Sequence, residues 1–222
     1  MRFRAFLFLI VAAGLLGFSA YVASVELKPY LQGNIASFQP EEGLAKGLPD
    51  VGLSLQSQQL ALMRCAEAAR SVTERLQPSK LRQPAMRNCQ LLADRITSAS
   101  PTNSFAWLVG AMAAAELVDP IGMRDRLRRS QETGPTEQWI AQGRVELAEN
   151  ARRRFGPDGL DFEAGDLKLL VLSQSGIGAI ASRYLGQPDF RDRITTIVET
   201  LPERDQERFV NWVAGAAREL LK

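Results

Sequence analysis

Residues 101–135 read PTNSFAWLVGAMAAAELVDPIGMRDRLRRSQETGP, and the predicted fold extends outward from this stretch. A first helix is expected over 102–118, where glycine and alanine side chains allow another helix to approach closely. Asp119-Pro120 ends this helix and opens a second one over 121–132, which Gly134-Pro135 ends in turn. The stretch is therefore predicted to form two helices joined by a short turn.

Helical patterns continue on both sides of this hairpin. Upstream, apolar side chains recur at steps of three and four residues, which places them on one face of each helix. The two stripes, separated by a break at residues 77–80, are Leu62, Cys65, Ala66, Ala69, Val72 and Leu76, and then Ala85, Cys89, Leu92 and Ile96. Downstream, helices are expected over 137–155, 162–185, 188–199 and 203–221. No stretch alternates as a strand does, so the predicted fold class is all-α.

A repeat is visible within this pattern. Pro101-Thr102 recurs as Pro135-Thr136, an offset of 34 residues, and a tryptophan follows each pair, at positions 107 and 139. A helix-turn-helix period of 34 residues is that of the tetratricopeptide repeats, and the unit over 104–137 resembles this family. The matching positions are Trp107 (large), Leu127 (bulky), Ser130 (small) and Pro135 (closing).

The resemblance departs from the family pattern at two positions of the same unit. Met123 stands where the family prefers alanine, and Ala111 where it prefers glycine; the neighbouring units match less well. The resemblance implies stacked antiparallel hairpins whose concave surface commonly binds a peptide or another protein. The alternative is a plain helical bundle. In both cases Trp107 and Trp139 are expected to anchor the core.

The N-terminus carries a membrane segment. Met1-Arg2-Phe3-Arg4 precedes residues 5–25, which have no charge and as a helix span about 31 Å, close to the thickness of a hydrocarbon core. Glu26 and then Lys28-Pro29 are expected to end the helix. A cleaved signal peptide is the alternative, with Val22-Ala23-Ser24 as its cleavage site, but the long apolar run favours an uncleaved anchor.

The basic flank predicts the orientation of this anchor. Arg2 and Arg4 are expected to stay in the cytoplasm, which sends the rest of the chain across the membrane. In a bacterium this arrangement gives a single-pass inner-membrane protein whose main domain is periplasmic. A buried core helix at this position is disfavoured by the flanking charges.

Four segments are expected along the chain. Residues 1–25 form the anchor, 26–52 a linker, 53–156 the hairpins, and 157–222 a C-terminal helical subdomain packed on the same stack. The linker is assigned from its helix breakers, which are Pro29, Gly33, Pro40, Gly43, Gly47 and Pro49.

The two cysteines fit an exported domain. Cys65 and Cys89 lie on neighbouring predicted helices and face the same intervening core at similar heights. They are candidates for one disulfide in an oxidising compartment, and two small buried thiols are the alternative.

Composition excludes several classes of function. The 222 residues include no histidine, which rules out Ser-His and Cys-His catalytic pairs and imidazole ligands for a metal. A net charge of +2 gives no case for nucleic-acid binding. We therefore expect no catalytic residue, cofactor or metal, and a non-enzymatic protein.

Two motifs resemble sites of other chemistry. Asp158, Asp161, Glu163 and Asp166 cluster, but acids at a helix start complement the helix dipole, and their spacing does not match a known calcium loop. Gly176-Ile177-Gly178-Ala179-Ile180-Ala181 fits a dinucleotide-type string after Leu169–Leu172, but no alternation of strands and helices surrounds it. One long helix with small residues for close packing is the favoured interpretation.

Two basic runs form a candidate face for anionic lipid or polysaccharide. Its residues are Arg124, Arg126, Arg128, Arg129, Arg152, Arg153 and Arg154. Both runs lie late in predicted helices, where cations suit the dipole, so a solvated face is the default interpretation.

Together these features predict a membrane-anchored envelope scaffold that binds another protein through a helical-repeat surface. The first alternative is a structural subunit of an inner-membrane secretion or surface-polysaccharide export assembly. The second is a carboxylate-based enzyme centred on the acidic cluster near residue 160.

Overall fold

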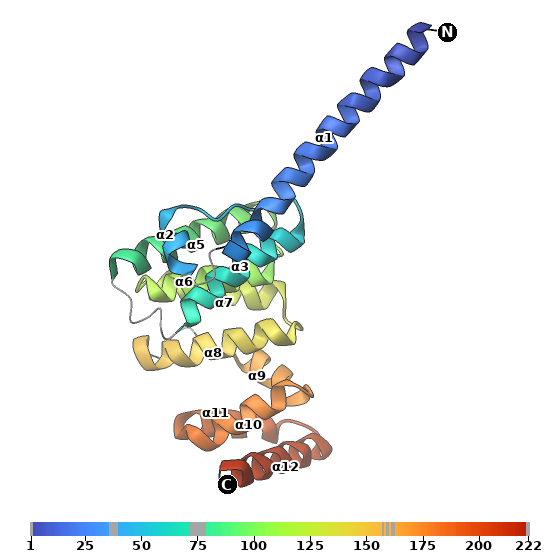
Figure 1. Ribbon diagram of the computed structural model, residues 1–222. Helices are drawn as coiled ribbons and strands as arrows, with labels where there is room; N and C mark the ends of the chain where they lie inside the picture. The colour runs from blue at the N-terminus through green and yellow to red at the C-terminus, as the bar shows by residue number, and fades with distance from the viewer. Residues whose placement is uncertain are drawn as a thin grey trace. The chain divides into compact units, whose positions relative to one another are not determined.

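The protein is all-helical. The computed structural model describes residues 2–35, 40–71, 79–156, 158, 160 and 163–220, and these ranges contain eleven helices and no strand. The predicted fold class is therefore confirmed. The chain comprises two compact units, residues 1–96 and 97–222 (Figure 1).

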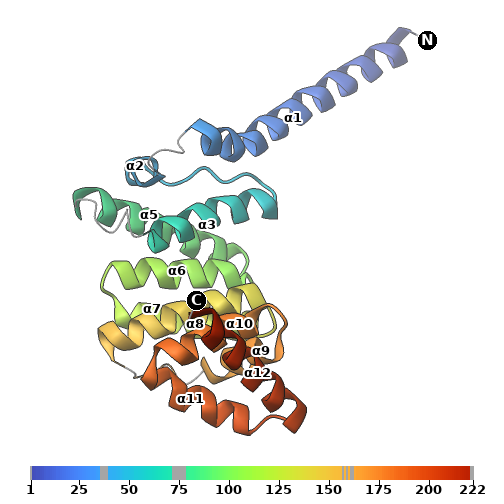
Figure 2. The same ribbon diagram turned by 60° about the horizontal axis from the view of Figure 1, so that its bottom comes forward.

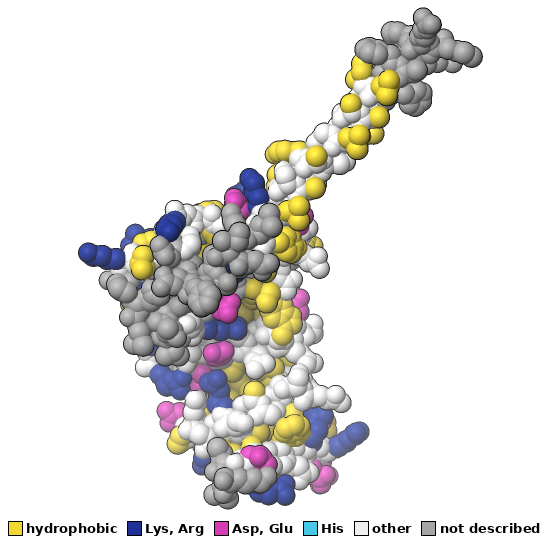
Figure 3. All heavy atoms as spheres, in the orientation of Figure 1, with side chains coloured by type: hydrophobic (Ala, Val, Ile, Leu, Met, Phe, Trp, Pro, Cys, Tyr) yellow, Lys and Arg dark blue, Asp and Glu magenta, His cyan; other side chains and the backbone are white. Residues whose placement is uncertain are grey.

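Unit 1 begins with the long apolar helix. Its helices are α1 (Arg2–Ile35), α2 (Pro40–Lys46), α3 (Leu55–Arg70) and α5, which starts at Ser79 and runs to Ala99. Within α1, the 22 residues Leu9–Tyr30 are long and apolar enough to cross a membrane. Exposed hydrophobic side chains recur along the described part of this segment in Figure 3, and Leu16 and Phe18 are among the most exposed.

The predicted end of the first helix is corrected by the structure. Instead of stopping at Glu26 and Pro29, α1 continues to Ile35, and residues 40–46 of the expected linker form α2. The Glu26 carboxylate accepts hydrogen bonds from the backbone N–H groups of Leu53 (2.9 Å) and Ser54 (3.1 Å), just before α3. The Arg64 guanidinium donates to the carbonyl of Pro29 at 2.7 Å. These contacts with α3 hold the last turns of α1 in place despite the proline.

The core of unit 1 is built from small side chains. The buried faces of α3 and α5 consist largely of alanine, with Leu62, Met86, Leu92 and Ile96 as the large members. Cys65 and Cys89, both buried, are joined by a disulfide with their Cα atoms 5.6 Å apart. The predicted pairing is thus present in the structure, and it ties α3 to α5 through the middle of their apolar stripes. Val72, Leu76 and the break at 77–78 lie outside the described residues.

Unit 2 contains the hairpin that residues 101–135 predict. Helix α6 (Ser104–Glu116) packs along α7 (Pro120–Thr133), and α8 (Gln138–Phe155) contacts both (Figures 1 and 2). The starts of α6 and α8 are 34 residues apart, as the repeated Pro-Thr pair indicates. The Ser130 hydroxyl, fully buried on α7, donates to the carbonyl of Ser104 at 2.8 Å. This geometry agrees with stacked hairpins; kinship with the tetratricopeptide repeats stays a prediction.

The turn between α6 and α7 is strained. Asp119 caps α7, since its carboxylate accepts from the backbone N–H of Gly122 at 2.9 Å. Val118, directly before it, has φ +62°, a left-handed conformation that is unfavourable for a β-branched residue, and its side chain is exposed. No local packing compensates for this strain through the valine side chain.

The remaining helices of unit 2 surround a second core. They are α9 (Glu163–Leu172), α10 (Gly176–Gly186), α11 (Pro188–Glu199) and α12 (Glu203–Leu220). Their buried side chains, together with two from α8 and Leu201 from the α11–α12 connection, form one cluster; its other large members are Leu167, Leu170, Ile177, Ile180, Phe190, Ile194 and Phe209.

The single helix expected over 162–185 is in fact two helices. The Ser173 hydroxyl donates to the carbonyl of Leu170 (3.0 Å) and accepts from the backbone N–H of Gly176 (2.7 Å). A serine side chain that bonds the backbone in this way competes with helical hydrogen bonds. The chain therefore turns at Ser173 and starts α10 at Gly176, in a direction that α12 can pack against.

Both tryptophans predicted to anchor the core are partly solvent-exposed. The Trp107 indole N–H donates to the carbonyl of Pro101 at 2.8 Å, and the Arg129 guanidinium lies over its ring at 5.1 Å. Trp139 is 53% exposed and packs one side of its ring on Phe105, with the ring centroids 4.8 Å apart. Their roles as core anchors are therefore corrected: alanines and leucines occupy the centre of the hairpin instead.

Candidate functional site

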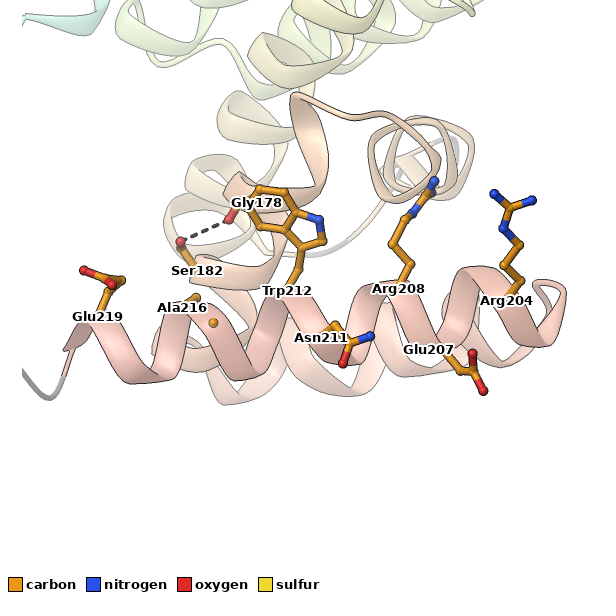
Figure 4. Close-up of a pocket in the computed structure, with 10 residues that line it drawn as sticks. Gly178, Ser182, Arg204, Glu207, Arg208, Asn211, Trp212, Ala216 and Glu219 are labelled. Carbon is orange, nitrogen blue, oxygen red and sulfur yellow. Dashed lines mark hydrogen bonds between the residues drawn. The ribbon is translucent and has the colours of Figure 1, made fainter.

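A groove between α10 and α12 is the candidate functional site. It has a volume of about 1000 Å³ and lies entirely within unit 2 (Figure 4). Eight of its lining residues come from α12 and two from α10; they are Arg204, Glu207, Arg208, Asn211, Trp212, Gly215, Ala216 and Glu219, with Gly178 and Ser182.

The groove follows from the amphipathic sequence of α12. Phe209 and Val213 face inward and join the core of unit 2, while the residues that line the groove recur every three or four positions on another face. Val210, 62% exposed, lies off both faces. The described helices against which α12 mainly packs are α10 and α11.

Trp212 forms the centre of the groove. Its ring lies against Gly178, where a Cβ atom would come within 3.3 Å of the indole, and 45% of the side chain remains exposed. The Ser182 hydroxyl turns back to donate to the carbonyl of Gly178 at 3.0 Å (Figure 4). Gly178 therefore allows a flat indole to rest on α10 with one face and an edge open to a ligand. Exposed tryptophans of this kind are frequent anchors in protein interfaces.

Two arginines line one end of the groove. Arg208 donates to the carbonyl of Val171 at 3.1 Å and pairs with Asp205 at 3.3 Å. Arg204, one turn earlier, makes no ion pair or side-chain hydrogen bond with the described residues, and Figure 4 shows both side chains on the same side of α12 as Trp212. Glu219 lines the opposite end. The groove is therefore basic at one end, aromatic in the middle and acidic at the other end.

The acidic cluster near residue 160 has a structural role where it is described. Asp158 is exposed, Asp161 lies outside the described residues, and Glu163 and Asp166 are buried in the first turn of α9. Both carboxylate oxygens of Asp166 accept hydrogen bonds from Arg144 of α8, Oδ2 from Nε at 2.7 Å and Oδ1 from Nη2 at 2.6 Å. Arg144 is 1% exposed and also donates to the carbonyls of Ser130 (3.1 Å) and Gly134 (3.1 Å). These bonds satisfy backbone carbonyls at the C-terminal end of α7.

A second ion cluster, in which the carboxylates are buried and the arginines partly exposed, joins α8, α9 and α11. Arg152 donates to Glu163 from Nη2 at 2.8 Å and lies 3.6 Å from Glu149, and Arg193 of α11 pairs with Glu149. Burial, reinforced by the neighbouring Glu149, raises the pKa of Glu163 to about 7. One Glu163 oxygen has no hydrogen-bond partner among the described residues. Because Glu149 and Glu163 pair with arginines between packed helices, neither carboxylate is presented to a substrate.

The predicted anionic-contact face is divided among internal contacts. Arg128 and Arg129 pair with Asp125, Arg153 donates to Asn150, and Arg152 belongs to the second ion cluster. The other three donate to backbone carbonyls; they are Arg124 (to Phe155), Arg126 (to Gly122) and Arg154 (to Ala115). The seven arginines therefore do not form one unpaired basic surface. Contact with anionic lipid or polysaccharide stays a prediction that this geometry does not favour.

The glycine string lies in a helical context. Leu169–Leu172 belong to α9, and Gly176–Ala181 open α10. A Cβ at Gly176 would come within 2.7 Å of a Leu170 methyl group, so this glycine serves close packing. Across the described part of the chain, no group of three or more acidic, cysteine or histidine side chains is placed to hold a metal ion.

Sequence reasoning missed the groove. The signal was present, because Arg204, Arg208 and Trp212 recur at four-residue steps along the predicted last helix. What the sequence did not show was that the opposite face, with Phe209, is the one that enters the core. No protein-family model, curated protein or solved structure matches this chain.

Proposed function

We propose that this protein is a membrane-anchored, non-catalytic scaffold that docks a protein partner in the groove between α10 and α12. The observation that carries the proposal is the half-exposed Trp212 at the centre of a groove with opposite charges at its ends, on a chain that also has one helix suited to cross a membrane. Such a surface suits a polypeptide that supplies both apolar and charged side chains.

The proposed topology places the N-terminus in the cytoplasm and the remainder in the periplasm of a bacterium. Arg2 and Arg4 before the apolar segment support this orientation. The Cys65–Cys89 disulfide supports an oxidising compartment for unit 1. Fusion reporters after residue 220 test it: a periplasm-active reporter is expected to work, and activity of a cytoplasm-only reporter would contradict the proposal.

The non-catalytic part of the proposal rests on the chemistry of the side chains. The sequence has no histidine, and the buried carboxylates of α9 are engaged by arginines in helix packing. Asp158→Ala removes an exposed acid of the cluster near residue 160 and leaves the ion pairs of Glu163 and Asp166 intact. We expect this variant to retain full function, whereas loss of function in a stable, correctly localised protein would favour an acid-based active site.

Docking is tested by site-specific cross-linking in membranes. A photo-cross-linking phenylalanine analogue at Asn211, in the groove, is introduced into the full chain, and the same analogue at Val210 serves as the matched control. We expect a discrete protein adduct from position 211 that Trp212→Ala abolishes, and none from position 210. Equal adducts from both positions, or none from either, would contradict docking in the groove.

A further inference from the structure

We infer that the partner docked in the α10–α12 groove is a second copy of this chain, related by a two-fold axis that passes beside Trp212. The inference rests on the proposed docking role of the groove and names its occupant. The order of the lining residues along α12 is self-complementary when the α12 helices of two copies pair antiparallel.

The charges match in the antiparallel arrangement. Arg204 and Glu219 line opposite ends of the groove, and the midpoint between them along the helix falls between Asn211 and Trp212. If two α12 helices pair antiparallel about that midpoint, Arg204 of each copy faces Glu219 of the other. The parallel arrangement would place like charges together, which disfavours it.

The shapes match in the same register. Arg208 of one copy faces Gly215 of the other, and Glu207 faces Ala216, so each long side chain meets a small one. The two indoles meet near the axis, where each ring already has one face against Gly178 and 45% of its side chain exposed. A two-fold axis requires one surface to fit itself, and this stripe of residues meets that requirement.

The proposed interface is small. Helix α12 has 18 residues and is about 27 Å long, so a contact limited to α12 and α10 falls in the class of weak interfaces. Anchoring both copies in one membrane raises their effective concentration and offsets this weakness. We therefore expect a reversible dimer that is favoured in membranes and dissociates on dilution in detergent.

The first test is cysteine cross-linking of the full chain in membranes. Asn211→Cys places one thiol per copy beside the axis, and oxidation is expected to give a disulfide-linked dimer on a non-reducing gel. Val210→Cys, on the same helix but off the groove, is the matched control and is expected to remain monomeric. The native Cys65–Cys89 disulfide is present in both variants and leaves the new thiol as the only free one.

The second test is a charge exchange measured by sedimentation equilibrium of the full chain in density-matched detergent. Arg204→Glu and Glu219→Arg are each expected to raise the dissociation constant about tenfold or more, because each creates two like-charge contacts at the interface. The double variant restores both pairs in reverse and is expected to return the constant to within about threefold of the original. Its recovery also shows that the single variants are folded.

Three outcomes overturn the inference. They are a monomeric full chain in membranes, equal cross-linking at positions 210 and 211, and self-association that ignores the charge at positions 204 and 219. The proposed function fails separately. A photo-adduct from position 211 that contains a different protein, with a monomeric chain, leaves docking standing and refutes the second copy. No adduct of any kind refutes both.

Discussion

The two units hold their helices together by different chemistry. Unit 1 has a core of small side chains on α3 and α5, closed by the Cys65–Cys89 disulfide. Unit 2 has no cysteine; besides its alanine-rich α6–α7 hairpin, it has a second core of large aliphatic and aromatic side chains and two clusters in which arginines pair with buried carboxylates. A disulfide acts mainly by restricting the unfolded chain, whereas a buried ion pair acts in the folded state. The comparison predicts that the two units respond to different perturbations.

The tryptophans make the comparison measurable. All three lie in unit 2, so tryptophan fluorescence reports the unfolding of that unit alone. Hydrogen exchange of the amides of α3 and α5 reports unit 1.

Removing the buried arginine of unit 2 is expected to have the largest effect. Arg144→Ala leaves Asp166 as an unpaired buried charge and removes the donors to Ser130 and Gly134, so the free energy of unfolding should fall by about 3–5 kcal/mol. Denaturant titration followed by tryptophan fluorescence measures it. Arg128→Ala, which breaks only exposed pairs, is the control and should cost less than about 1 kcal/mol. Equal effects of the two variants would show that the buried pair contributes nothing special.

Removing the disulfide should affect unit 1. The bridge spans 24 residues, and Cys65→Ala with Cys89→Ala is expected to destabilise this unit by about 3 kcal/mol. Amides of α3 and α5 should then exchange faster, while the tryptophan-detected transition of unit 2 stays in place. The unaltered chain, denatured without reductant, is expected to show no free thiol; two labelled cysteines would refute the disulfide.

Stability of unit 2 should depend on pH through Glu163. Its pKa is about 7 in the folded protein and near 4.5 in the unfolded chain, so between these values the folded state keeps a proton that the unfolded state has lost. The contribution of Glu163 to the free energy of unfolding is therefore complete below pH 4.5. It decreases as the pH rises from 4.5 to 7, and the total loss is up to about 3 kcal/mol. Glu163→Gln should flatten this dependence; an unchanged slope would assign it to another group.

Relief of strain at the α6–α7 turn should have the smallest effect. Val118→Gly keeps the turn and removes the Cβ that makes φ +62° unfavourable, while glycine loses more chain entropy on folding. The net expectation is a gain of up to about 1 kcal/mol in the tryptophan-detected unfolding of unit 2. Ile121→Gly, at an exposed helical position nearby, is the control and should be destabilising. A loss for Val118→Gly would mean that the valine side chain has a packing role.

Local physics made much of the fold predictable. Asp119-Pro120 and Gly134 end and start helices because their effect on the backbone needs no distant partner, and the observed α6 and α7 lie within two residues of the predicted bounds at each end. The apolar N-terminal segment was predictable for the same reason, because it depends on local composition alone. The end of the first helix was misplaced because a tertiary contact decided it: Arg64 and the N-terminus of α3 let α1 continue past Pro29. The break between α9 and α10, in contrast, depends on local hydrogen bonds of Ser173 that the helical pattern does not reveal.

The sequence by itself determined the helical class, the single apolar segment at the N-terminus, the hairpin over 101–135 and the absence of histidine chemistry, because each depends on composition or on neighbours within a few residues. Only the tertiary structure decided which polar groups become buried partners. Arg144 and Asp166 are 22 positions apart, and Trp212 of α12 reaches Gly178 of α10 although the whole of α11 lies between them in the sequence. Whether an acid becomes a core ion pair, or a tryptophan opens into a groove, depends on which helix faces pack together, and that choice is made by the whole unit.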